Sequence, residues 1–305
     1  MGKYQEHIPV LLDHCRKYLF EERGQKNNLD YMDITLGGGG HLRNFLESYN
    51  ISSVTALDQD PDAIEHNQDL LKSDKAAVSI IHTNFHEYLD KSGEQLESSF
   101  DVILGDLGVS SHHFDSADRG FSFRFDAELD MRMNTTRGYK ASDILREYTK
   151  EELLELLFTF GEEKFAHRIV DRILEQRGKS PITMTKQLEE ICYLSYPKSL
   201  RYKKTHPATK TFQALRIEVN REFEVLELSL PILFNCLKPG GRLGIISFHS
   251  SEDRIVKHGF KKIYTENKDR CKIVTKKPIV AGVQEVEQNP RARSAKLRVI
   301  EKLVL

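Results

Sequence analysis

The sequence predicts an α/β protein in which a parallel sheet with helices on both faces is interrupted by an inserted helical domain. Over the first third of the chain, short apolar runs of strand length alternate with stretches of helical spacing. A run of glycines, Gly37 to Gly40, joins the first apolar run to a helix. From Ala141 the pattern is purely helical for about 60 residues, which is longer than a single crossover helix. The apolar runs then resume, so we expect the helical segment to be an insertion.

The glycine turn lies between a predicted strand, Tyr31 to Leu36, and a helix whose apolar face includes Phe45. Glycines allow the backbone to pass close to a ligand, and the helix N-terminus presents free N–H groups to it. A dinucleotide fingerprint needs a third glycine, but Leu42 stands at that position. The turn therefore predicts an adenosine ligand without a pyrophosphate.

Three further strands end in residues that suit the same ligand. Val54 to Leu57 leads into Asp58, about 18 residues beyond the turn, where an acidic residue typically binds ribose hydroxyls. The next two predicted strands, Val78 to Ile81 and Phe100 to Leu104, end near Phe85 and Asp106. Because ligands of open α/β sheets gather at the carboxyl ends of the strands, we expect these residues to lie together.

The rest of the chain divides into a long loop, a helical insert and a returning sheet. The loop spans 107–140, and Thr149 with Glu152 forms a capping box in the helical pattern that follows. We predict an insert at 117–211, and a sheet domain of 1–116 with 212–305. The second part of this domain is expected to hold one long helix over 212–230 and a helix capped by Ser250 or Asp253. Its predicted strands are Arg242–Phe248, Lys272–Val274 and Lys296–Leu303.

Composition is typical of a globular protein of the reducing cytosol. The chain has 305 residues, 39% hydrophobic and 30% charged. No apolar run approaches the ~20 residues of a membrane span, and the N-terminus resembles no signal or transit peptide. The four cysteines are far apart with no C-x-x-C, so we expect free thiols and no metal site. We therefore expect a cytoplasmic location and no membrane partner.

A net charge of −1 means that a polyanion would have to be held by a local basic patch. The densest such run comprises Lys198, Arg201, Lys203, Lys204, His206 and Lys210. It abuts the return of the sheet pattern, and for this reason we favour phosphate contact over a solvated face. Phenylalanines alternate with other residues at Phe121, Phe123 and Phe125. This pattern favours packing of their rings in the core over stacking on an RNA base. His249 either touches substrate or is structural, and the sequence does not separate these possibilities.

Eight motifs then carry a family resemblance across nearly the whole chain. They are GGGGHL, ALDQDP, DLGVSS, RGFSF, LDMRM, HPATKTFQALRIEVN, PGGRLGIISFHSSEDRIVK and NPRARSAKLR. In this order they resemble the S-adenosylmethionine-dependent cytosine-N4 methyltransferases of bacterial small-subunit (16S) ribosomal RNA. The resemblance implies a seven-stranded Rossmann-like methyltransferase sheet interrupted by a helical substrate-recognition domain. It also implies methylation of a cytosine near the decoding centre.

The resemblance further implies the cofactor site, residue by residue. The expected contacts to S-adenosylmethionine are Gly39, Gly40 and His41 in the turn, Asp58 on the ribose, Phe85 near the adenine, Asp106 beside the methyl donor, and His113. At His113 the family usually has glutamine, and at His112 proline, although a histidine can also donate a hydrogen bond.

Methyl transfer to a cytosine N4 amine favours an acceptor for the amine protons, and Asp106 is our catalytic candidate. We expect Arg201, Lys203, Lys204 and His249 to contact the RNA, in an assembled or assembling small subunit. The oligomeric state stays open, with a homodimer among the alternatives. Two other functions are also weighed: a nicotinamide oxidoreductase, disfavoured by the missing glycine, and an idle RNA-binding assembly factor, disfavoured by the intact turn and Asp106.

Overall fold

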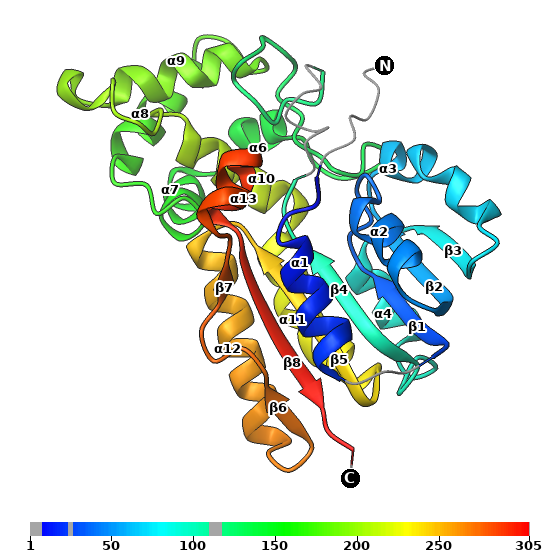
Figure 1. The fold of residues 1–305 in the computed structure, drawn as a ribbon. Coiled ribbons are helices and arrows are strands. Elements are labelled where there is room, and N and C mark those ends of the chain that lie inside the picture. The colour runs from blue at the N-terminus through cyan, green and yellow to red at the C-terminus, as the bar shows by residue number, and fades with distance from the viewer. Residues whose placement is uncertain (1–7, 24–26, 110–117, 305) are drawn as a thin grey trace. The chain divides into compact units, whose positions relative to one another are not determined.

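The computed structural model describes residues 8–23, 27–109 and 118–304. These residues form two compact units (Figure 1). The sheet unit contains the described residues up to Gly108 and those from Phe223 onward, whereas the helical unit runs from Val109 to Glu222. Within the described ranges, no helix combines the length and the apolar character needed to cross a membrane.

The sheet unit is built on eight strands in the order β3-β2-β1-β4-β5-β8-β6, with β7 also paired to β8. Their bounds are β1 Leu29–Asp33, β2 Ile51–Asp58, β3 Ala77–His82, β4 Phe100–Asp106, β5 Leu237–Ser247, β6 Cys271–Ile273, β7 Ile279–Val280 and β8 Lys296–Lys302. Strands β1 to β5 pair in parallel, and β8 is antiparallel to its neighbours. The resemblance implied seven strands; the eighth is the two-residue β7.

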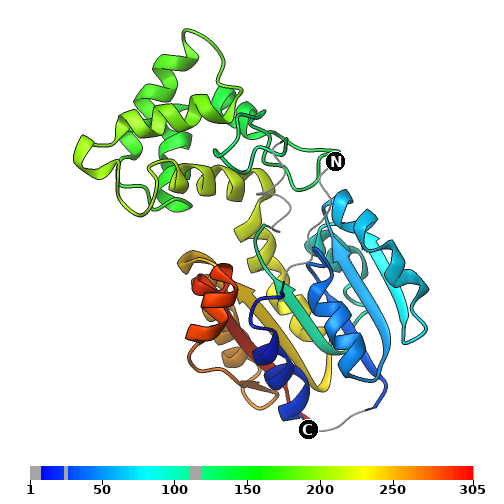
Figure 2. The ribbon, with the colours of Figure 1, turned by 45° about the horizontal axis from the view of Figure 1, so that its top comes forward.

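Helices cover both faces of this sheet (Figure 2). They are α1 Leu12–Cys15 with a π turn Arg16–Phe20 and a 3₁₀ turn Glu21–Arg23, α2 Gly40–Ser48, α3 Pro61–His66 with a 3₁₀ turn Gln68–Lys72, α4 Phe85–Ser92, α11 Glu222–Asn235, α12 Ser250–Glu266, and α13 Val283–Gln288 with a 3₁₀ turn Pro290–Ser294. Neighbouring residues of β1 belong to different cores: Tyr31 packs with Leu19 and Phe45, and Met32 packs with Leu230. Alternation along the strand thus joins two apolar layers.

The described residues of the helical unit form a bundle with its own apolar core. Its helices are α6 Ala141–Glu147, α7 Lys150–Thr159, α8 Ala166–Arg177, α9 Thr185–Ser195 with a 3₁₀ turn Lys198–Leu200, and α10 Thr209–Asn220. The expected capping box is confirmed, because the Thr149 hydroxyl accepts from Glu152 N while the Glu152 carboxylate accepts from Thr149 N. Leu156, Ile169 and Leu188 illustrate the helical stripes that meet in the core.

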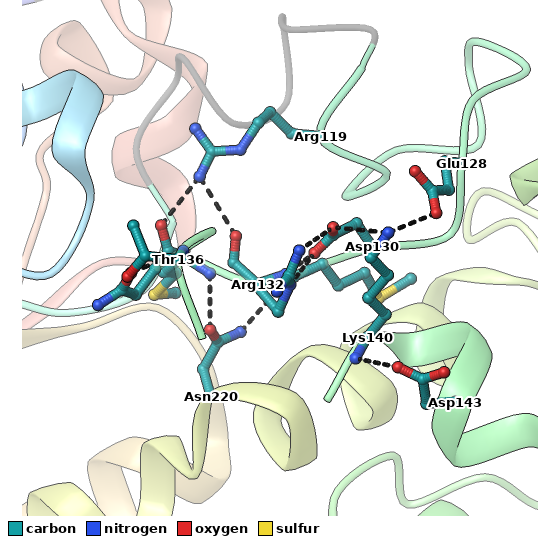
Figure 3. A network of polar contacts seen from close by, with 11 residues as sticks. Arg119, Glu128, Asp130, Arg132, Thr136, Lys140, Asp143 and Asn220 are labelled. Atoms are coloured by element: carbon teal, nitrogen blue, oxygen red, sulfur yellow. Dashed lines mark hydrogen bonds and ion pairs between the residues drawn. The ribbon is translucent and has the colours of Figure 1, made fainter. Parts of the chain in front are cut away.

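The long loop before α6 is held by side chains that bind its backbone (Figure 3). Arg119 is buried and donates to the carbonyls of Arg132 and Met133, at 3.2 and 2.9 Å. Asn220, at the end of α10, accepts from Met133 N at 2.8 Å. Asp130 pairs with the Arg132 guanidinium through two contacts of 2.8 Å. Because backbone groups are bound in this way, the described part of the loop, 118–140, is held in place although it contains no named helix or strand.

Two local predictions are wrong. The long helix expected over 212–230 is two helices, α10 and α11, because Arg221 adopts a left-handed conformation with φ 50° and ends α10. Helix α12 is capped by His249 rather than by Ser250 or Asp253. The His249 ring nitrogen Nδ1 accepts from Glu252 N at 3.3 Å, which is the role that a serine or aspartate usually has.

Candidate active site

Asp106 ends β4 at the carboxyl edge of the sheet, and its surroundings leave part of its carboxylate unused. Its backbone N–H donates to the Thr35 hydroxyl at 2.6 Å. The side chain is 28% exposed, yet its Oδ1 atom is buried and has no hydrogen-bond partner among the described residues. The other oxygen, Oδ2, lies 3.7 Å from His41 Nδ1. A buried acceptor without a donor is costly unless a ligand supplies one.

Three more carboxylates, Asp33, Asp58 and Glu252, occur at strand ends or just beyond them, and with Asp106 we call them the acidic edge. Burial, and after it the negative charges of Asp33 and Glu252, raise the pKa of Asp106 to about 8. Burial likewise raises the pKa of Asp33 to about 6, although hydrogen bonds from Thr35 N and Tyr31 Oη oppose the shift. A cation bound here would be stabilised by these charges.

His41 lies in the first turn of α2 and is buried beside Asp106. Its Nε2 lies 3.0 Å from the carbonyl of Val10, which can only accept, so Nε2 carries a proton. Burial lowers the pKa of this imidazole to about 4, so the ring is neutral near pH 7 and Nδ1 is an acceptor. His41 is therefore fixed in one tautomer facing Asp106.

Asn67 holds the glycine turn in place, because its side-chain amide donates to the Gly37 carbonyl at 2.8 Å. Gly39 has φ 74°, and a Cβ placed on it would lie 2.2 Å from Asn67 Oδ1. Both the backbone conformation and the space therefore require glycine at this position. Gly40 begins α2, whose first N–H groups have no partner within the helix.

Asp58 connects the end of β2 to the same turn. One carboxylate oxygen accepts from Gly37 N at 2.7 Å, and the other accepts from Asp60 N at 2.8 Å. An ionised carboxylate has about four lone-pair sites, so both oxygens can still accept from ribose hydroxyls. Phe85 begins α4, after Asn84, and is partly buried against the apolar layer that contains Leu89.

Sequence reasoning missed Asp33, Thr35 and Glu252. Asp33 is the last residue of β1 and Thr35 lies between this strand and the glycines, so an acidic residue shortly before the turn was the available signal. Glu252 is 2% exposed and accepts from Phe248 N at 2.8 Å. Its signal was the spacing of His249 and Glu252, which matches a capping box.

The expected RNA-binding residues fall in different units. His249 caps α12 in the sheet unit, whereas Arg201, Lys203 and Lys204 follow α9 in the helical unit. Lys203 and Lys204 are exposed. Arg201 is engaged, since its Nε donates to the Tyr196 carbonyl at 2.9 Å and its Nη2 to the Leu194 carbonyl at 3.2 Å. His113 lies outside the described residues.

Comparison with known proteins places this geometry in a family. The family model described as "MraW methylase family" matches residues 4–303. The chain belongs to the MraW methylase family. A relative from Nostoc punctiforme named "Ribosomal RNA small subunit methyltransferase H" is 47% identical over 90% of this chain and 88% of its own length. A relative of the same name from Picosynechococcus is 46% identical over 97% of this chain and 96% of its own length.

Family membership identifies the chain as a methyltransferase and implies S-adenosylmethionine as its cofactor. The nicotinamide alternative is therefore wrong. The residues present fit a sulfonium cofactor, because the negative charges of Asp33 and Glu252, which act on Asp106, favour a cation at the acidic edge. In the described part of the chain, no group of three or more His, Cys, Asp or Glu is arranged to hold a metal ion.

Proposed function

We propose that this methyltransferase transfers the methyl group of S-adenosylmethionine to the exocyclic N4 amine of a cytosine in small-subunit (16S) ribosomal RNA, near the decoding centre. The observation that carries the proposal is the unpartnered, buried Oδ1 of Asp106 at the end of β4. An amine bearing two protons is the kind of donor that this atom lacks. The names of the relatives support ribosomal RNA as the substrate.

In the proposed cofactor site, Gly39, Gly40 and His41 contact the methionine side, Asp58 binds the ribose, and Phe85 lies beside the adenine. His113 is proposed as a further contact. Asp58 is suited to its role because the Gly37 and Asp60 N–H groups orient both of its oxygens. The cofactor supplies a methyl carbon on a sulfonium, where transfer depends on in-line positioning rather than on acid–base help.

In the proposed reaction, Asp106 accepts a hydrogen bond from the N4 amine and takes the proton that the nitrogen loses as the new N–C bond forms; the methyl–sulfur bond would break in the same step, and the cofactor would leave as a neutral thioether. It must be ionised to do so, although its pKa is about 8 without ligand. A positive charge bound at the acidic edge lowers that pKa. Asp106 thus becomes an acceptor when a cation is bound. His41 is neutral near pH 7 and its Nδ1, 3.7 Å from Asp106 Oδ2, carries no proton, so His41 does not neutralise the carboxylate.

The helical unit is proposed to recognise the RNA. The insert expected at 117–211 falls within it, and exposed Lys203 and Lys204 supply positive charge there. Arg201 contributes by binding the backbone carbonyls of Leu194 and Tyr196, which holds the stretch of chain that carries Lys203 and Lys204. His249, in the sheet unit, is proposed as a second contact to the RNA. The substrate is proposed to be an assembled or assembling small subunit in the cytoplasm.

The decisive experiment is transfer of tritiated methyl groups to isolated small subunits, followed by nucleoside analysis. N4-methylcytidine is the expected product, and slower accumulation of it with Asp106→Asn is the control. Label in another nucleoside would contradict the proposal for N4. RNA binding without any methyl incorporation would instead favour the idle assembly factor.

A further inference from the structure

The last turn of α9 and the segment that follows it gather aromatic and cationic side chains on the surface of the helical unit. We call Tyr193, Arg201, Tyr202, Lys203, Lys204 and His206 the aromatic–basic segment. Tyr202 is 85% exposed, the most exposed of the large hydrophobic side chains among the described residues. Lys203 and Lys204, which follow it directly, are also exposed. Exposed rings next to lysines are typical of surfaces that bind single-stranded nucleic acid.

The exposed ring of Tyr202 is held in place by contacts with a neighbouring side chain. The Tyr202 hydroxyl lies 3.1 Å from that of Tyr193, and the two rings meet edge to face at 6.4 Å with an angle of 84°. The Arg201 guanidinium lies over the Tyr193 ring, 4.9 Å from its centroid. A side chain that is already ordered loses less entropy when a ligand stacks on it.

Arg201 also fixes the backbone from which Tyr202 projects. Its two hydrogen bonds bind the carbonyls of Leu194 and Tyr196, at the end of α9, where the last carbonyls of a helix lack partners. On the other side, the His206 ring stacks on Phe123 at 4.6 Å with an angle of 26°. The segment is therefore anchored on both sides of Tyr202, Lys203 and Lys204.

This arrangement selects one class of ligand. A double-stranded RNA hides its base faces inside the helix and is recognised through its backbone and groove shape. An unpaired nucleotide offers a base face for an aromatic ring, and its flanking phosphates can meet lysines. The ordered, exposed ring of Tyr202 can stack on the base of an unpaired nucleotide but not on the hidden bases of a duplex.

We infer that the aromatic–basic segment is a binding site for unpaired RNA, in which Tyr202 stacks on a base other than the methylated cytosine while Lys203 and Lys204 bind the adjoining phosphates. The inference rests on the proposed function for the identity of the polymer as RNA. It extends that function by naming a second recognised nucleotide and its single-stranded state.

The test measures binding of a single-stranded RNA of about ten nucleotides carrying 2-aminopurine, whose fluorescence falls when the base stacks, and of the same sequence as a duplex. We expect quenching and tighter binding for the single strand. Tyr202→Ala should weaken its binding on the order of tenfold and abolish the quenching, because stacking on one ring contributes roughly 1–3 kcal/mol per base. Tyr202→Phe keeps the ring and its edge-to-face contact with Tyr193 but loses the hydroxyl contact, so it should keep the quenching with a smaller loss of affinity than Tyr202→Ala.

Tyr139→Ala is the matched control, since Tyr139 is 63% exposed in the same unit and lies outside the segment. It should leave affinity and quenching unchanged. Equal binding of strand and duplex, or unchanged quenching in Tyr202→Ala, would overturn the inference. The binding test does not depend on methylation. Failure to form N4-methylcytidine in small subunits would refute the proposed reaction. Loss of quenching in Tyr202→Ala would still show that the aromatic–basic segment binds the unpaired RNA.

Discussion

The acidic edge and the aromatic–basic segment differ in charge and in burial. Asp33 and Glu252 are 3% and 2% exposed, whereas Tyr202 is 85% exposed. The edge uses backbone N–H groups to orient carboxylates, and the segment uses backbone carbonyls to orient a guanidinium. One region suits a small cation in a water-poor site, and the other suits a polyanion at the surface. The net charge of −1 is a sum over the whole chain, so it reveals neither the acidic edge nor the aromatic–basic segment.

The two regions also differ in what they contribute to stability. Buried carboxylates with raised pKa values destabilise the folded chain wherever they are ionised. Exposed lysines beside aromatic rings carry no such cost, because water still solvates their charge. A polar site that costs stability is expected where ligand chemistry requires it. This difference predicts large effects at the edge and small ones in the segment.

The largest effect is expected from Asp106→Asn. The substitution keeps the shape but removes the charge and weakens the acceptor. Loss of one such contact typically costs ~2.7–4 kcal/mol, or roughly 100- to 1000-fold in rate. Single-turnover methylation at saturating cofactor and RNA is the measurement, because it isolates the chemical step from binding. If the variant reacts within a few-fold of the parent, Asp106 is a cofactor-pocket residue only.

The same substitution should stabilise the ligand-free protein at high pH. The pKa of Asp106 is about 8 when folded, against an ordinary value of 3.8. Between these values the folded state holds a proton that the unfolded state has released, so parent stability falls as pH rises. With the side chain 28% exposed, water screens the effect, and Asp106→Asn should gain about 1–3 kcal/mol near pH 8 relative to pH 4.

Chemical denaturation of parent and variant across this range tests the sign. Asp33 titrates in both proteins, and because its charge acts on Asp106 the difference between them reports Asp106 together with its coupling to Asp33. A variant whose advantage grows as the pH falls would show that Asp106 is stabilised in its charged form.

Local sequence signals predicted local structure well. Thr149 and Glu152 form the capping box that begins α7, as their spacing indicated. The end of α10 at Arg221 was missed because no glycine or proline marks it. Its left-handed conformation accompanies an ion pair between Arg216 and Glu222 at 2.8 Å, a contact across the break that spacing alone does not encode.

For the candidate site, sequence reasoning found residues at strand ends but not their mutual influence. Asp58 and Asp106 could be chosen because each directly follows an apolar run. That Asp33 and Glu252 raise the pKa of Asp106 depends on which strands are neighbours in the sheet. Likewise, Arg201 looked like a phosphate ligand, and only the three-dimensional structure shows its bonds to backbone carbonyls.

An intermediate effect is expected from Asp58→Ala at the acidic edge. Losing a hydrogen bond to a charged partner costs roughly 1.5–3 kcal/mol, so affinity for S-adenosylhomocysteine should fall about tenfold or more. Calorimetric titration gives the value, with thermal unfolding alongside because Asp58 also orients Gly37 N. Asp58→Asn, which retains one acceptor, should fall between parent and alanine. Unchanged affinity in a folded alanine variant would remove Asp58 from the site.

The smallest effect is expected from the double substitution Lys203→Ala with Lys204→Ala. Each lysine that neutralises a phosphate on a single strand contributes about −0.7 to the slope of log affinity against log salt. Losing both should therefore flatten the slope by about 1.4 and weaken RNA binding by about three- to tenfold at moderate salt. Arg201 is left intact, since its removal would release the end of α9 and confuse charge with folding.

The matched control for this pair is Lys179→Ala with Lys186→Ala, which makes the same change of net charge in the same unit. Lys179 pairs with Glu175 at 2.6 Å and Lys186 with Glu189 at 2.7 Å, so neither is expected to bind phosphate. Binding to a labelled single strand, titrated with salt, should separate the two pairs, while cofactor affinity stays at the parent value in both. If the control flattens the slope as much as the test pair, the attraction comes from the overall charge of the unit and not from the aromatic–basic segment.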